Sequence, residues 1–161
     1  MPLAFHSQSS TIILPSSHPS SLQVCNPRTS QLVSELEVSS SNRVGRTFEE
    51  QLQPSRVEHA AVSDNGEWLA TTDYREPTGP FHPEVHLKIW SWDHESESWM
   101  LNTRIERPHA LARVSSLAFR PKVSEDDDLF LITVGGDGNI KSWGIRTQKV
   151  KTGLAEGTLA Y

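Results

Sequence analysis

A histidine and an aspartate in the second half of the chain are the side chains most suited to acid–base chemistry. His109 follows a proline, and Asp137 lies in the turn Gly135-Gly136-Asp137-Gly138. A carboxylate that orients an imidazole ring can help to activate a nucleophile. The same pair can instead belong to a buried structural relay, and we favour that role. The carboxylates of Glu125–Asp128 form a contiguous loop run rather than an opposed pair, so an enzyme is the weaker hypothesis.

Two histidines and the single cysteine suggest metal or nucleophile chemistry less strongly. His82 and His86 are four residues apart, a spacing that forms one face only on a helix, and Pro83 between them opposes a helix. We therefore disfavour a metal site. Cys25 has no histidine or aspartate at a recognisable offset, and we interpret it as a small buried hydrophobic residue.

Three tryptophans, Trp90, Trp92 and Trp99, could provide a surface on which nucleic-acid bases stack. On consecutive strands, tryptophans more commonly fill the space between packed sheets. We favour this second role.

The elements that position these residues are best defined between Val114 and Gly144. Val114–Phe119 alternates apolar and polar residues, and Arg120-Pro121 ends it. Leu129–Val134 is a nearly continuous apolar strand, and the glycine-rich turn after it predicts a tight hairpin into Ile140–Trp143.

This strand–loop–strand–turn–strand pattern resembles one blade of a WD-repeat β-propeller. In such blades a histidine, a hydroxyl residue, a turn aspartate and a tryptophan form a buried hydrogen-bonded tetrad. The resemblance assigns these positions to His109, Thr133, Asp137 and Trp143. Gly144 stands where the repeat usually has the aspartate of its Trp-Asp pair.

The fold class predicted is all-β, with about three partial blades that do not close into a ring. Residues 1–10 are predicted to be a disordered N-terminus, and 153–161 a frayed C-terminus. The other predicted segments are partial blade 1 at 11–38, a linker or insertion at 39–56, blade 2 at 57–106 with a proline-rich insertion at 74–83, and blade 3 at 107–152. In blade 1, Cys25 replaces the tryptophan, and in blade 2 the insertion removes the turn aspartate, so we expect neither to have a complete tetrad.

Incomplete blades leave apolar sheet faces uncovered. We expect Trp90, Trp99 and Phe119 on or near such faces, and we expect the chain made alone to self-associate. Within the linker, Arg43, Arg46 and Arg56 are basic, and solvation is favoured over an RNA or protein contact.

Composition excludes some classes of function. Hydrophobic residues make up 35% of the chain and its formal net charge is −5, which does not predict unaided binding to a phosphate backbone. One cysteine suits a reducing compartment. We find no signal-peptide pattern and no apolar run long enough to span a membrane. We therefore expect a soluble intracellular protein.

A narrower resemblance covers about residues 11–152. The strings SDNGEWLATTD, EVHLKIWSWD, WMLNTRIERPH and GGDGNIKSW are similar to the small-subunit processome propeller family of the WD-repeat protein 75 (Nan1) type. WMLNTRIERPH is the most discriminating, since a generic blade has no reason to keep it.

The resemblance implies a non-catalytic scaffold for ribosome biogenesis in the nucleus and nucleolus, which supports pre-rRNA processing and ribosomal-RNA transcription. It implies other processome proteins as partners, with pre-rRNA or snoRNA contacted through the complex. It implies no cofactor, no metal, no membrane and no small-molecule substrate. The alternative is a WD-repeat adaptor of another complex, such as a ubiquitin-ligase substrate receptor or a chromatin scaffold.

Overall fold

The structure is a computed structural model that describes residues 1–40, 53–122, 127–152 and 155–160. Within these ranges all regular elements are β-strands. The described residues contain no helix long and apolar enough to span a membrane. The all-β prediction is confirmed.

The strands form three antiparallel sheets and one short hairpin, and each strand pairs with its sequence neighbours. The first sheet contains β1 (Ala4–His6), β2 (Thr11–Pro15), β3 (Ser21–Asn26) and β4 (Gln31–Glu37). The second contains β5 (Arg56–Val62), β6 (Trp68–Arg75), β7 (Glu84–Asp93) and β8 (Ser98–Glu106). The third contains β9 (Val114–Phe119), β10 (Leu129–Gly135) and β11 (Ile140–Ile145), and β12 (Thr147–Thr152) pairs with β13 (Ala155–Ala160).

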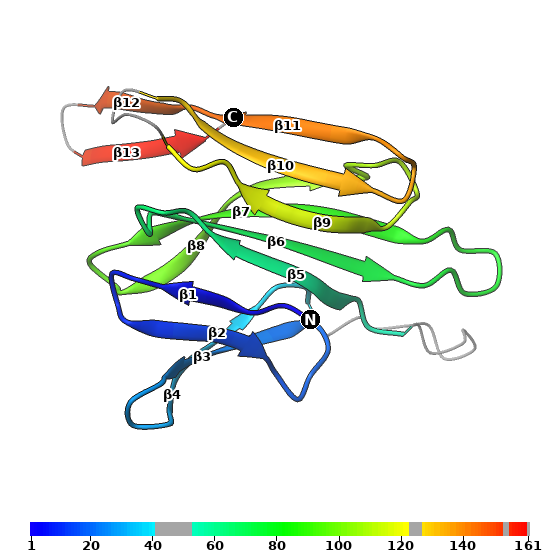
Figure 1. Ribbon diagram of the computed structural model, residues 1–161, viewed down its shortest axis with the longest axis horizontal. Helices are drawn as coiled ribbons and strands as arrows, with labels where there is room; N and C mark the ends of the chain where they lie inside the picture. The colour runs from blue at the N-terminus through cyan, green and yellow to red at the C-terminus, as the bar shows by residue number, and fades with distance from the viewer. Residues whose placement is uncertain (41–52, 123–126, 153–154, 161) are drawn as a thin grey trace.

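The three sheets are stacked in chain order, with the second between the other two (Figure 1). The first strands of the three sheets lie along one side of the stack, where β1 contacts β5 and β5 contacts β9. This is the arrangement of consecutive propeller blades, whose innermost strands converge on a central axis. None of the described sheets closes into a barrel.

The second sheet is buried on both faces, because its strands send alternate side chains into two separate cores. One face meets the first sheet, in a core that joins Leu69 and Trp90 to Ile13 and Leu22. The other face meets the third sheet, in a core built around residues of β6, β7, β10 and β11: Trp68, Ala70, Leu87, Ile89, Leu129, Leu131 and Ile145. Both layers of apolar contact therefore depend on the second sheet.

The structure corrects the prediction for both ends of the chain. The N-terminus contains β1, which pairs with β2 through the register Ala4↔Ile13, and is therefore not disordered. Residues Ala155–Ala160 form β13 rather than a frayed end. β12 lies within the segment predicted as blade 3, but it pairs with β13 and not with β11, so the described third sheet has three strands. Both segments are short and lack a clear alternation of apolar and polar residues, so the sequence did not predict how these strands pair.

Two of the three aromatic residues expected near uncovered faces are buried instead. Trp90 and Trp99 are 5% and 7% exposed, in the core between the first and second sheets. Phe119 is half-buried against the core between the second and third sheets. Residues of β2 and β3 in the first sheet, among them Ile13, Leu22 and Val24, belong to the core that covers the tryptophans.

The predicted linker lies mostly outside the described residues, and so do Arg43 and Arg46. Arg56 is described, begins β5, and is exposed.

Candidate functional site

The third sheet brings together the four residues assigned to the tetrad. His109 Nε2 lies 2.8 Å from Thr133 Oγ1, and His109 Nδ1 lies 2.9 Å from Asp137 Oδ1. Trp143 Nε1 donates to the same Thr133 oxygen at 2.9 Å. The four side chains thus form one continuous chain of hydrogen bonds.

With an ionised carboxylate and a neutral imidazole, the relay runs in one order. Asp137 can only accept, so His109 carries its proton on Nδ1 and donates it to Asp137. His109 Nε2 then accepts the hydroxyl proton of Thr133, and the Thr133 oxygen accepts from the indole N–H of Trp143. His109 and Thr133 are both fully buried, so the hydroxyl is closed to an incoming substrate. The arrangement therefore stabilises the third sheet and does not activate a nucleophile.

The turn between β10 and β11 holds the carboxylate in place. Asn139 donates to Asp137 through its backbone N–H and through its side-chain amide, at 3.1 and 3.0 Å. These bonds from Asn139, and then the His109 ring, lower the pKa of Asp137 to about 2. A side chain at Gly135 would overlap the His109 ring and the Asp137 carboxylate, and Gly138 has a φ of 77°. Gly135 is therefore required by the relay, and Gly138 by the backbone conformation of the turn.

The second sheet keeps only half of this pattern. Trp90 Nε1 donates to Thr71 Oγ1 at 2.9 Å, which matches the bond between Trp143 and Thr133. His59, on the first strand of the sheet, bonds to Thr72 instead. The connection between β6 and β7 is the insertion, and it supplies no aspartate to complete the relay.

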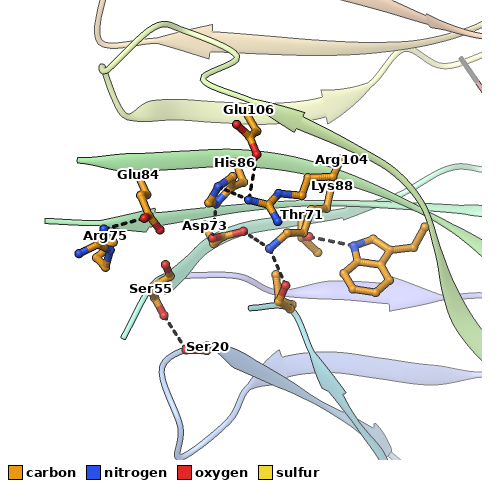
Figure 2. A network of polar contacts seen from close by, with 12 residues as sticks. Ser20, Ser55, Thr71, Asp73, Arg75, Glu84, His86, Lys88, Arg104 and Glu106 are labelled. Carbon is orange, nitrogen blue, oxygen red and sulfur yellow. Dashed lines mark hydrogen bonds and ion pairs between the residues drawn. The ribbon is translucent and has the colours of Figure 1, made fainter. Parts of the chain in front are cut away.

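A different polar network occupies the second sheet, and sequence reasoning missed it (Figure 2). Asp73 is fully buried on β6 and accepts from His86 at 2.9 Å and from Lys88 at 2.7 Å. Lys88 also donates to the backbone oxygen of Val38, beyond β4, and Arg104 donates to His86 Nε2 at 3.0 Å. The network crosses from the second sheet into the first. A signal was present, because the apolar runs of β6 and β7 are interrupted by charged or titratable residues that share one face.

The other candidate residues have structural surroundings. Both ring nitrogens of His86 are hydrogen-bonded, so His86 is not free to bind a metal with His82. Within the described ranges, no group of three or more His, Cys, Asp or Glu residues is arranged to hold a metal ion. Cys25 is half-buried rather than buried, and its thiol lies 3.9 Å from the Gln23 side-chain oxygen.

The tryptophans fill space between sheets rather than forming a platform. The rings of Trp92 and Trp99 pack edge-on at 5.0 Å, and the buried ring of His6 lies 4.4 Å from Trp92. His6 belongs to β1 of the neighbouring sheet. The aromatic group is therefore part of the contact between the first and second sheets.

Comparison with known proteins matches the chain over residues 3–156 to the family model described as the WD repeat-containing protein 75 second beta-propeller. The protein named WD repeat-containing protein 75 from Xenopus laevis is 36% identical over 94 residues, which are 57% of this chain and 11% of that protein. The Danio rerio protein of that name is 32% identical over 97 residues, 60% of this chain and 11% of its own length. The Homo sapiens protein of that name is 30% identical over 84 residues, 52% of this chain and 10% of its own length.

The matched segment thus spans about a tenth of the length of these curated relatives. The family model covers nearly the whole chain, including the second sheet and the third sheet with its relay. The chain belongs to the WD repeat-containing protein 75 family, within the region of its second β-propeller.

Proposed function

We propose that this chain is a non-catalytic scaffold segment in ribosome biogenesis. In this proposal it acts in the nucleolus as part of the small-subunit processome and supports pre-rRNA processing and ribosomal-RNA transcription. Other processome proteins are its direct partners, and pre-rRNA or snoRNA is reached through the complex.

The observation that carries the proposal is the segment WMLNTRIERPH, together with the family to which the chain belongs. Part of this segment has a structural role, since Trp99 is buried and His109 belongs to the relay. Met100 and Leu101 are 54% and 50% exposed on β8, at the outer edge of the second sheet. Exposed apolar residues on an edge strand are suited to contact with a partner protein.

A scaffold also fits the way in which the polar groups are used. The polar groups of the His109–Asp137 pair are hydrogen-bonded within the relay. In the Asp73 network, Lys88 is hydrogen-bonded to a backbone group. Rigid sheets that present loops and edges to several partners are the usual contribution of a propeller.

Rapid depletion of the natural gene product that carries this sequence tests the proposal. Early pre-rRNA cleavage intermediates should accumulate, measured by hybridisation with probes to the transcribed spacers. Resupply of the wild-type protein should restore the normal profile, and this is the matched control. A normal pre-rRNA profile after depletion, with co-purification of ubiquitin-ligase or chromatin proteins, would favour the adaptor alternative.

A further inference from the structure

Arg75, the last residue of β6, is a buried cation whose hydrogen bonds are incomplete. Its side chain is 4% exposed, and its Nη2 donates to Glu84 Oε1 at 2.6 Å. Its Nε and Nη1 are buried and have no hydrogen-bond partner in the described parts of the chain. Buried N–H groups almost always have partners, so two unpaired nitrogens on one guanidinium require an explanation.

Arg75 lines a cavity of about 290 Å³ at the end of the second sheet, beside the insertion between β6 and β7. Two further arginines, Arg104 and Arg107, line the same cavity, against two carboxylates, Glu84 and Glu106. The cavity therefore carries an excess of positive charge, whereas the whole chain has a formal net charge of −5. We call this cavity the Arg75 pocket.

The ion pairs within the pocket leave some of its cationic groups available to a ligand. Arg104 lies 3.1 Å from Glu106, but both side chains are largely exposed, and exposed ion pairs contribute little. Arg107 is exposed at the rim, and its backbone N–H donates to the Val85 carbonyl oxygen, which fixes its position at the mouth. A ligand carboxylate can thus meet exposed guanidinium groups from β8 and from the segment after β8, in a cavity whose wall also contains the buried guanidinium of Arg75.

We propose that the Arg75 pocket binds the carboxylate of an acidic peptide segment on a partner protein. A planar guanidinium is the preferred protein group for a carboxylate, and charge-assisted bonds of this kind are strong. The apolar side of the segment would rest on Phe81, which is 46% exposed, and on Pro83 at the rim. The partner chemistry is therefore an aspartate or glutamate next to an apolar residue.

A polyanionic nucleic acid fits the pocket less well. The glutamates Glu84 and Glu106 would face successive phosphates, whereas a single carboxylate needs only one site. The pocket is also small and isolated in a chain of net negative charge. The proposal does not depend on the processome assignment, because it concerns direct binding at one site.

Fluorescence anisotropy with the natural gene product tests the proposal. The probe is a short fluorescein-labelled peptide with aspartates on both sides of one phenylalanine, and the matched probe has asparagines in place of the aspartates. The aspartate peptide should bind at least about tenfold more tightly, because the charge-assisted bonds are lost in the other. Arg107→Ala and Arg75→Met should each weaken its binding by about tenfold.

Arg28→Ala is the control variant, because Arg28 is exposed in the turn after β3, in the first sheet. It should leave binding of the aspartate peptide unchanged. If Arg75→Met does not fold, as judged by near-ultraviolet circular dichroism, Arg107→Ala still removes a rim cation. Glu84→Gln, which removes a competing carboxylate, should then strengthen binding a few-fold.

Equal binding of the two peptides would overturn the proposal, as would unchanged binding in Arg107→Ala. A labelled uridine oligonucleotide is the third probe. If it binds through these arginines while the aspartate peptide does not, the ligand is a phosphate and the carboxylate proposal is wrong.

Discussion

Lys88 Nζ donates to the backbone carbonyl oxygen of Val38 at 2.5 Å, and so a buried charge on the second sheet ties down the end of the first. The same ammonium group also pairs with Asp73, which is fully buried. One side chain therefore neutralises a carboxylate and satisfies a backbone group across the contact between two sheets.

Removal of this ammonium group should be strongly destabilising. Lys88→Met leaves Asp73 as a buried carboxylate without its cation, so the free energy of unfolding should fall by about 3–5 kcal/mol. Urea denaturation of the natural gene product would measure it. Lys122→Met, at an exposed lysine, is the control and should have little effect. An equal, small effect of the two substitutions would contradict the network.

The double variant Asp73→Asn with Lys88→Met should recover part of that loss, because it removes the unpaired charge as well as its partner. The same urea experiment tests it. Strictly additive losses would show that the two groups do not interact.

Thr133 should be the most sensitive position of the third sheet, because its hydroxyl joins His109 to Trp143. Thr133→Val keeps the shape but leaves a buried ring nitrogen and an indole N–H without partners, at a cost of about 1–3 kcal/mol. Thermal unfolding followed by tryptophan fluorescence would show it. Ser142→Ala, at an exposed position of β11, provides the comparison. No difference between the two variants would mean that the relay contributes nothing to stability.

Stability should also depend on pH through His6. Burial lowers the pKa of His6 below 6.5, against the raising effects of its bond to the Gly66 carbonyl and of nearby Glu67, while His94 lowers it further. The unfolded chain then takes up a proton at a higher pH than the folded one. Stability is full above pH 6.5 and is lost as pH falls below that value.

The variant His6→Gln should flatten this loss of stability between about pH 7 and pH 5. Burial also lowers the pKa of His59, so His59→Gln should flatten it in part as well. His82→Gln, at an exposed histidine that is not among the groups acting on His6, serves as the control. A pH profile that is the same in wild type and His6→Gln would contradict the assignment.

The 161-residue chain made alone should self-associate. Leu32 and Val33 are 60% and 58% exposed on the edge strand β4, and Ile140 is 73% exposed on β11, at the other end of the stack. Exposed apolar edge strands pair with other copies. Size-exclusion chromatography should show oligomers, and Val33→Lys should reduce them. A sharp monomer peak with cooperative melting would show that the three sheets are sufficient by themselves.

The sequence predicted the third sheet well because its signals are local. Alternation, a glycine-rich turn and a terminal tryptophan lie within Val114–Gly144, and the strands of the structure follow them closely. The relay residues could be assigned because they keep the positions of a known repeat.

The charged residues that interrupt β6 and β7 were visible in the sequence, but their partners in the network around Asp73 could not be assigned, because they depend on the pairing of strands. His86 stands opposite Asp73 only once β6 and β7 are in register, and the insertion between them hides that relation in the sequence. The contact between Lys88 and Val38 depends on the stacking of two sheets. β1 was missed because a strand of three residues gives too short a pattern.

The position of the second sheet between two others has a consequence for synthesis on the ribosome. Its strands pair only with sequence neighbours, so the sheet can form as soon as Glu106 has emerged, against a first sheet that is already complete. Its other face, with Trp68 and Leu87, remains exposed to solvent until β9 to β11 have been synthesised. During that interval the nascent chain presents one apolar sheet face, which is the surface that chaperones bind.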